Sequence, residues 1–187
     1  MRQTICLLLL SLAFTVAASS QEKKPQEGYA GEERREIKSL SAAEVEQLLQ
    51  GHGMGLAKAA ELNHYPGPRH VLELAAELQL TPEQRAHAQE TFERMRGEAV
   101  RLGRQIVERE KELDASFAKG DIDSGKLHTA TSEIARLQGT LRAAHLAAHL
   151  EMRRLLSPAQ IKKYDELRGY STGKKTPAGL NHRHGKH

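Results

Sequence analysis

Cysteine is nearly absent from this sequence of 187 residues, because Cys6 is the only one. Cys6 lies inside an apolar N-terminal segment, so removal of that segment would leave a chain with no thiol. Such a chain cannot form a disulfide or use a cysteine nucleophile. We therefore expect neither in the mature protein.

Aromatic residues are also scarce, since the chain has no tryptophan, three phenylalanines and four tyrosines. The formal net charge is +4 and the pI is near 9.2, which by itself would be compatible with nucleic-acid binding. The basic residues alternate with glutamates along presumed helices, a pattern typical of solvated faces. Few rings are available to stack on bases, so we expect no nucleic-acid partner.

Long hydrophobic runs are absent as well. The longest extends from Ile5 to Val16, which is too short to span a membrane. Arg2 precedes it and small residues follow it, as in a secretory signal peptide. We expect residues 1–20 to be a cleaved signal and the mature protein to be soluble and exported, in the periplasm of a Gram-negative cell.

What the chain does contain is one short stretch written twice, as LTPEQ and LSPAQ. The shared positions are Leu80, Thr81 and Gln84 in the first copy, and Leu156, Ser157 and Gln160 in the second. The threonine and the serine suit the N-cap of a helix, and proline then occupies the first helical position. Glutamine three residues after the cap can complete a capping box. Each copy therefore predicts a helix start.

Apolar residues recur three and four positions apart from Pro82 to about Lys119, and again from Leu127 to Leu155. This spacing gives each segment one apolar face, and the turn KGDIDSG lies between them. The pattern predicts two long antiparallel helices. Shorter helices are expected from Ser41 to the glycine-rich GHGMG, before and after the PGP turn at 66–68, and over about 158–168.

The sequence thus predicts an all-α fold, a long helical hairpin with short N- and C-terminal helices. Residues 21–40 read as a flexible leader, 41–170 as the helical domain, and 171–187 as a disordered tail rich in histidine and lysine. A single hairpin buries little apolar surface, so we expect a homodimer. The alternative is a monomer in which the short helices complete the core.

The doubled motif on a helical, cysteine-poor chain behind a signal peptide resembles the LTxxQ-motif proteins of the bacterial envelope. This is the Spy/CpxP family, which is related to periplasmic heavy-metal sensors and zinc-resistance-associated proteins. The resemblance covers about residues 41–170 and implies a four-helix hairpin that dimerises into a curved cradle. It also implies two functions, because some relatives are chaperones that need no ATP and others bind Ni, Co or Zn and signal to a membrane partner.

The chaperone hypothesis requires a surface that holds unfolded envelope proteins, and it requires no cofactor. Arginine suits such weak contacts because it combines a charge with a flat stacking face. The candidate client-binding residues are Arg94, Arg101, Arg104, Arg142 and Arg153. The alternative is that these side chains form ordinary ion pairs along solvated helix faces.

The metal hypothesis rests first on His145 and His149, which are four residues apart and so share one helix face. Met152 could add a soft thioether ligand for Zn, Ni or Co, although the relatives place histidine four residues before this methionine and this chain has Ala148 there. His70 and Glu73 could join if the N-terminal helix folds over the hairpin. The alternative is that all of these side chains pack or face solvent.

Other histidines and methionines carry less weight. Three tail histidines, His182, His184 and His187, are suited only to weak, adventitious metal binding. Met54 could be a soft metal ligand, but a role in filling the core beside the glycine break is favoured. We expect no enzymatic activity, because the sequence offers no nucleophile motif and no glycine-rich phosphate loop. A third hypothesis is that the protein regulates a sensor kinase without a client or metal of its own.

Overall fold

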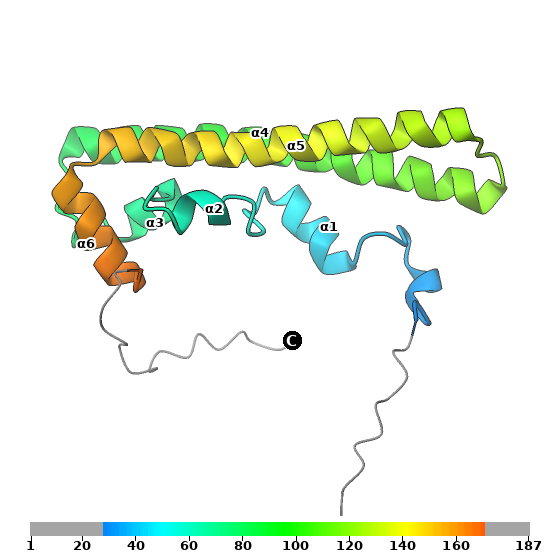
Figure 1. Cartoon of the computed structure of the whole chain (residues 1–187), viewed down its shortest axis with the longest axis horizontal. Helices are drawn as coiled ribbons and strands as arrows, with labels where there is room; N and C mark the ends of the chain where they lie inside the picture. Colours follow the sequence, from blue (N-terminus) through cyan, green and yellow to red (C-terminus); the bar gives the residue numbers. More distant parts are fainter. Residues whose placement is uncertain (1–27, 171–187) are drawn as a thin grey trace, which may run out of the picture. The chain divides into compact units, whose positions relative to one another are not determined.

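The structure, a computed structural model, describes residues 28–170, and the chain divides into two units between Glu33 and Arg34. In the first unit, the described residues 28–33 form a turn in which the N–H of Glu32 donates to the carbonyl of Tyr29 at 3.0 Å. The short 3-10 helix η1 (Glu32–Arg34) begins in this turn. The second unit contains all the α-helices (Figure 1).

The second unit is entirely helical over its described residues. Its helices are α1 (Ala42–Leu49), α2 (Lys58–Glu61), α3 (Pro68–Glu73), α4 (Pro82–Lys119), α5 (Ser124–Leu155) and α6 (Pro158–Arg168). No strand occurs within residues 28–170. The predicted all-α hairpin is therefore confirmed, and α4, α5 and α6 occupy the segments that the sequence assigned to them.

The doubled motif forms two helix starts that contact each other. Thr81 caps α4, Ser157 caps α6, and each has a complete capping box with its glutamine. The two glutamine side chains also pair: the Nε2 of Gln84 and of Gln160 each donates to the other's Oε1 at 2.9 Å. Their remaining amide protons go to the carbonyls of Leu155 and Leu78. Both half-buried amides are thus fully hydrogen-bonded.

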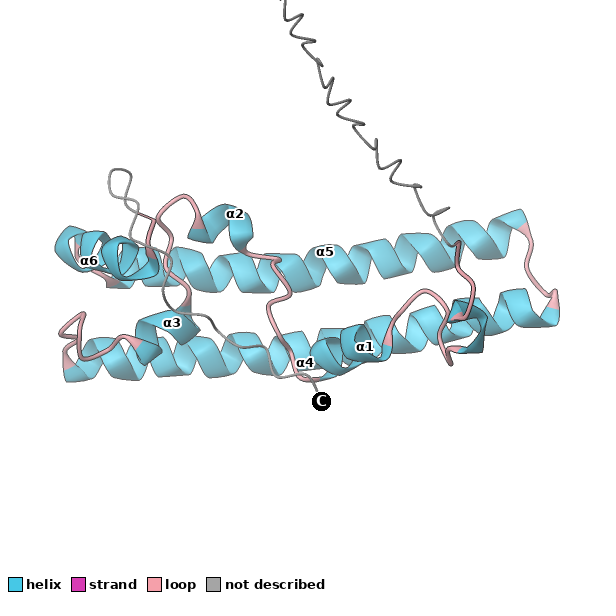
Figure 2. Ribbon diagram, turned by 90° about the horizontal axis from the view of Figure 1, so that it is seen from below, coloured by secondary structure: helices cyan, strands magenta, loops and turns pink. Residues whose placement is uncertain are grey.

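The long helices α4 and α5 run antiparallel, joined by a tight turn. Gly120 ends α4 with φ of 68°, a left-handed conformation that glycine adopts without strain. Asp123 then caps α5 by accepting a hydrogen bond from the N–H of Lys126 at 2.8 Å. Helices α1, α2 and α3 lie along one side of this hairpin, as Figures 1 and 2 show.

Helix α1 comes especially close to α4 at Gly103. A Cβ atom on this residue would collide with the backbone carbonyl of Leu48 at the end of α1. Gly51, just beyond α1, has φ of 68°, and a Cβ there would lie 3.1 Å from the carbonyl oxygen of Arg96. The first long helix therefore carries a glycine where the short helix crosses it.

Two separate groups of buried side chains hold the second unit together. The end core joins α3, α4, α5 and α6 and comprises Val71, Leu78, Ala88, Met152, Leu156, Ile161 and Tyr164. The middle core joins α1, α4 and α5 and comprises Leu48, Ala99, Leu102, Ile106, Leu137 and Leu141. The short helices thus complete both cores within one chain, and the homodimer expected from the sequence stays a prediction.

The hairpin is less well covered near its turn. Phe117 on α4 is 55 % exposed and Leu127 on α5 is 40 % exposed. Part of the segment expected as a flexible leader lies beside α4 here, because Ile37 is only 5 % exposed and Lys38 pairs with Asp114 at 2.9 Å. This region offers apolar side chains to a partner.

Candidate functional site

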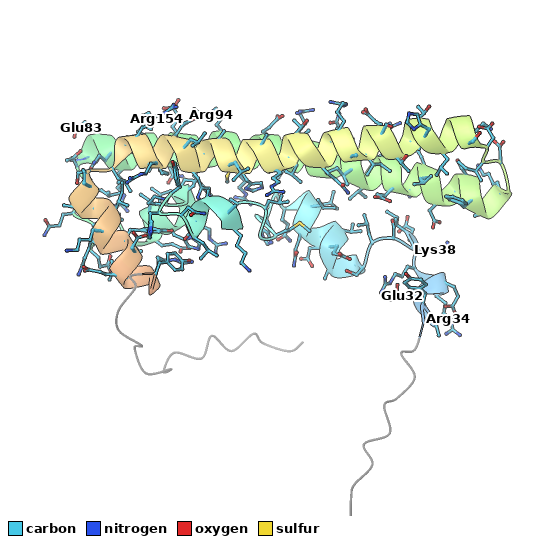
Figure 3. All side chains as sticks on the ribbon, in the orientation of Figure 1. Glu32, Arg34, Lys38, Glu83, Arg94 and Arg154 are labelled. Carbon is cyan, nitrogen blue, oxygen red and sulfur yellow. The ribbon has the colours of Figure 1, made fainter. Side chains whose placement is uncertain are left out.

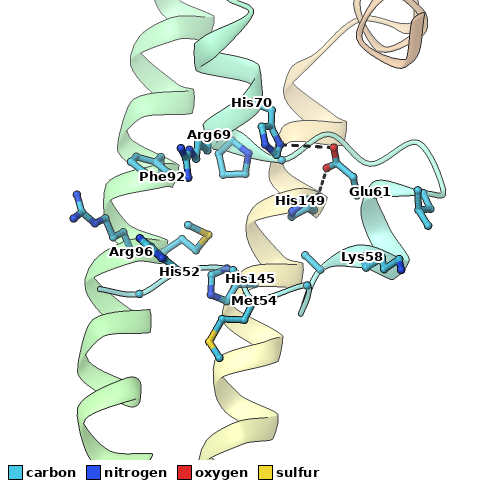
Figure 4. Close-up of a pocket in the computed structure, with 18 of the residues that line it drawn as sticks. His52, Met54, Lys58, Glu61, Arg69, His70, Phe92, Arg96, His145 and His149 are labelled. Carbon is cyan, nitrogen blue, oxygen red and sulfur yellow. Dashed lines mark ion pairs between the residues drawn. The ribbon is translucent and has the colours of Figure 1, made fainter. Parts of the chain in front are cut away.

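A cavity of about 620 Å³ lies beside the hairpin, between the end core and the middle core. Its walls come from the segment 50–70, from α4 around Phe92 and from α5. Four histidines line it: His52, His70, His145 and His149. Figure 4 shows these side chains converging from three parts of the chain. We refer to this space as the histidine cavity.

Glu61, at the end of α2, is the carboxylate of this cavity. Its Oε1 accepts hydrogen bonds from the hydroxyls of Tyr164 at 2.5 Å and Tyr170 at 3.2 Å. The Nε of Arg168 lies 3.5 Å from the same oxygen. Because the side chain is only 12 % exposed, these contacts fix it firmly and join α2 to the C-terminal helix.

Two histidines on different helices lie close to the carboxylate of Glu61. The Nδ1 of His70 on α3 lies 3.7 Å from Oε1, and the Nδ1 of His149 on α5 lies 3.7 Å from Oε2. Burial lowers the pKa of His70, with a smaller contribution from the charge of Arg168. The imidazole of His70 is therefore neutral at pH 7, with one nitrogen able to accept a proton or a cation.

His149 has a fixed ring orientation. Its Nδ1 lies 2.7 Å from the backbone carbonyl of Tyr65, so this nitrogen carries the proton and donates it. The lone pair then belongs to Nε2, which faces Gly67: a Cβ on Gly67 would lie only 3.1 Å from it. Metal-binding histidines are commonly oriented by such an N–H to carbonyl bond.

His145, one turn before His149 on α5, is buried more deeply, at 4 % exposure. Its Nε2 has no hydrogen-bond partner within residues 28–170. Burial lowers the pKa of His145, and electrostatic interaction with the neighbouring His149 lowers it further. The side chain is thus a neutral imidazole with an unused nitrogen, and buried nitrogens of this kind are rare in folded proteins.

Comparison with known proteins gives one result that concerns this site. The model of a family described as heavy-metal resistance matches residues 52–163, more than half of the chain. The chain belongs to this family. The match begins at His52, the first histidine of the cavity, and confirms the resemblance to the Spy/CpxP-like, zinc-resistance-associated proteins. No curated protein and no solved structure matched in the other two comparisons.

Because the chain belongs to a heavy-metal resistance family, the residues that line the histidine cavity can be compared with the ligands that metal ions require. Within residues 28–170, no three side chains from His, Cys, Asp and Glu lie close enough together to hold one ion. The carboxylate of Glu61 is already held by Tyr164, Tyr170 and Arg168. The other donors that line the cavity are imidazoles and the thioethers of Met54 and Met95. The residues therefore fit a cation that accepts nitrogen and sulfur ligands without a carboxylate.

The metal ligands proposed from sequence fall in different places. His145, His149 and His70 all line the cavity. Met152 is fully buried in the end core, and Glu73 pairs with Arg69 at 2.9 Å on the surface. Sequence reasoning missed Glu61 and treated Met54 as a core residue. Glu61 reaches the cavity as the last residue of α2, and Met54 is 41 % exposed.

The five candidate client-binding arginines are spread over the long helices. Arg94 pairs with Glu151 at 2.5 Å across the hairpin, and Arg101 pairs with Glu98 at 2.6 Å within α4. Arg153 lies over the ring of Tyr65, 5.8 Å from its centroid. Arg104 and Arg142 are exposed and form no ion pair within the described segment. Figure 3 shows Arg94 projecting from the hairpin on the side away from α1–α3.

Outside the cavity, a contact between His64 and Asp165 joins α6 to the loop after α2. The Nδ1 of His64 lies 2.8 Å from Oδ2 of Asp165. His64 has φ of 66°, an uncommon conformation for a residue with a side chain.

Among residues 28–170, no helix is long and apolar enough to cross a membrane.

Proposed function

We propose that this protein binds a heavy-metal cation in the histidine cavity as its part in heavy-metal resistance in the periplasm. The observation that carries the proposal is that His52, His70, His145 and His149 line one cavity. Three separate parts of the chain contribute them. Neutral imidazoles are the commonest protein ligands of Zn, Ni and Cu.

The two cores support a binding role rather than a purely structural one. Apart from the hydroxyl of Tyr164, each core is built from apolar groups, so the hairpin has an apolar basis for stability without a metal. Binding in the space between the cores would then join α1–α3 to α5 more firmly. We propose that this added stability of the metal-bound form is what a membrane sensor protein would recognise.

The test is equilibrium dialysis of the purified protein against Zn²⁺, Ni²⁺ and Co²⁺, and against copper. We expect one tight site that weakens by about tenfold or more in His145→Gln, in His149→Gln or in both. His128→Gln is the matched control, since this exposed histidine lies on the same helix. Replacement of His182, His184 and His187 by alanine should leave the tight site in place. Equal binding by His145→Gln, His149→Gln and the wild type would contradict the proposal.

A second candidate function is chaperone-like binding of unfolded proteins without ATP. The observation that favours it is the pair of exposed apolar side chains near the hairpin turn, Phe117 and Leu127. Exposed arginines such as Arg104 lie on the same helices. Unfolded chains bind through mixed apolar and charged contacts of this kind.

This candidate is tested by light scattering from an aggregating client protein, in EDTA and again with zinc. Suppression in EDTA that is lost in Phe117→Ser would support client binding without a metal. Suppression only with zinc would make the metal a switch for client binding. No suppression in either condition would exclude the chaperone function. Sedimentation of the Phe117→Ser variant would show whether the same surface holds the expected homodimer.

A further inference from the structure

The histidine cavity contains two groups of donors, and the second group has no carboxylate. Near Glu61 lie His70 and His149. Farther along α5, His145 lies against the loop 51–55: a Cβ on Gly53 would be 4.0 Å from both Nδ1 and Cε1 of its ring. The residues on either side of that glycine are His52 and Met54. Figure 4 shows His52, His145 and Met54 grouped together, away from Glu61.

The loop passes close to α4 at its first residue and has open space beside its last. At Gly51, a Cβ would lie 3.0 Å from a methyl group of Val100, whereas nothing approaches within 4 Å of the same position on Gly55. Met54 has φ of 46° and a side chain that is 41 % exposed. Core packing therefore does not explain why a methionine occupies this position.

His145 is the most deeply buried histidine of the cavity, and no ion pair or hydrogen bond within residues 28–170 occupies its ring. It is more than nine-tenths buried, and its Nε2 has no hydrogen-bond partner in the part of the chain described. The ring meets the loop along its Nδ1 and Cε1 edge. A cation held beside the loop would therefore take the lone pair of Nδ1, and Nε2 would carry the ring proton.

The chemistry of the donors selects the class of cation. Mg²⁺ and Ca²⁺ require oxygen ligands. Zinc in proteins is held by three or four His, Cys, Asp or Glu side chains, and residues 28–170 bring no three of these together. Thioether sulfur combined with imidazole favours copper(I). A second thioether, that of Met95 on α4, lines the same cavity.

We propose that His52, Met54 and His145, with Met95 as a further sulfur donor, form a binding site for copper(I). This inference rests on the proposed function, because it names the cation and the ligands within the same cavity. All four donors are uncharged, so the bound ion keeps its single positive charge, and a monovalent cation is less costly to bury than a divalent one. Glu61, already bonded to Tyr164, Tyr170 and Arg168, is not a ligand.

The test is competition for copper(I) between the purified protein and a chromogenic copper(I) chelator under anaerobic conditions. A parallel titration with Zn²⁺ uses a zinc indicator. We expect one copper(I) ion per chain, with affinity reduced about tenfold or more in Met54→Leu and in His145→Gln. Met152→Leu is the matched control, because it makes the same substitution in the end core, outside the cavity. X-ray absorption of the copper-loaded protein should show sulfur scattering that Met54→Leu diminishes.

The outcomes separate this inference from the proposed function. Copper(I) binding that depends on His145 but not on Met54 or Met95, with no sulfur scattering, would overturn the thioether site and leave a metal-binding cavity. Zinc binding that depends on His149, without copper(I) binding, would also overturn the copper(I) site and leave the proposed metal-binding function in place. The absence of tight binding of either cation would overturn the copper(I) site and the proposed function together. Binding lost only when His182, His184 and His187 are replaced by alanine would assign the metal to the tail and overturn both as well.

Discussion

The hydroxyl of Tyr164 on α6 donates a hydrogen bond to the carboxylate of Glu61 on α2, with 2.5 Å between the oxygen atoms. Tyr164 is fully buried in the end core, and Glu61 lines the histidine cavity. This bond therefore links the side chains that hold the C-terminal helix to the walls of the candidate site. A change on either side of it affects both.

Replacing Tyr164 by phenylalanine should lower the free energy of unfolding by about 1.5–3 kcal/mol, the usual contribution of a hydrogen bond to a charged group. Tyr170→Phe is the matched control, and its effect should be smaller because its bond to Glu61 is longer, at 3.2 Å. Urea denaturation of both variants measures the difference. If both substitutions lowered the free energy of unfolding equally, the hydrogen bond from Tyr164 to Glu61 would not be the stronger of the two.

Alkaline pH should also destabilise the fold through Tyr164. Burial raises the pKa of its hydroxyl, and the hydrogen bond to Glu61 raises it further. Above pH 10, the ordinary tyrosine value, the unfolded chain releases this proton while the folded chain keeps it. Stability is therefore complete below pH 10 and falls above it, by up to about 1.4 kcal/mol per pH unit. Tyr164→Phe should lack this component when denaturation is measured from pH 9 upward.

Gln84 and Gln160 should be energetically coupled, because each amide hydrogen-bonds to the other. Replacing either one by alanine leaves the other amide partly unsatisfied, which destabilises a fold by about 1–3 kcal/mol. The double variant should lose less than the sum of the two single losses, by about 0.5–3 kcal/mol. A thermodynamic cycle by urea denaturation measures this. Gln89→Ala, which removes an exposed bond to Glu93, is the control.

Two glycines of α4 should respond in opposite ways to alanine. Gly103→Ala should destabilise the protein by about 1–3 kcal/mol, because the new methyl group collides with the carbonyl of Leu48. Gly97→Ala places a methyl group where nothing lies within 4 Å. It should stabilise the protein by about 0.5–1 kcal/mol through helix propensity. The same sign for both substitutions would contradict the close crossing of α1 over α4.

Mild acid should weaken the fold through His145. Its pKa is lowered, first by burial and then by electrostatic interaction with the neighbouring His149. Below pH 6.5, the ordinary value, the unfolded chain gains a proton that the folded chain resists. The stabilising effect of a neutral His145 is thus present above pH 6.5 and is lost as the pH falls below it. His145→Gln should reduce this slope, with His128→Gln as the control from an exposed site.

The helices were predictable because local chemistry determines their ends. Thr81 with Pro82, and Ser157 with Pro158, specify two helix starts regardless of tertiary contacts. The pairing of Gln84 with Gln160 was not predictable, because each capping box is complete as a local structure. Only the folded hairpin brings the two ends together.

The candidate site was predictable in part. The spacing of His145 and His149 placed both on one helix face, and they do line one cavity. Glu61 escaped notice because it lies in a four-residue helix between loops, where no periodicity marks a buried carboxylate. Met152 was misleading for the opposite reason: its spacing from His149 suits a ligand, but the arrival of α3 and α6 encloses it in the end core.

The reciprocal amide pair also restricts how this sequence can change over generations. Loss of one glutamine leaves the half-buried amide of the other without part of its hydrogen bonding, so single substitutions should be selected against even though each motif is an ordinary helix cap. Replacement of both by apolar residues of similar size removes the problem in one step. The two copies, far apart in the chain, should therefore be kept together or lost together, and they behave in inheritance as a single motif.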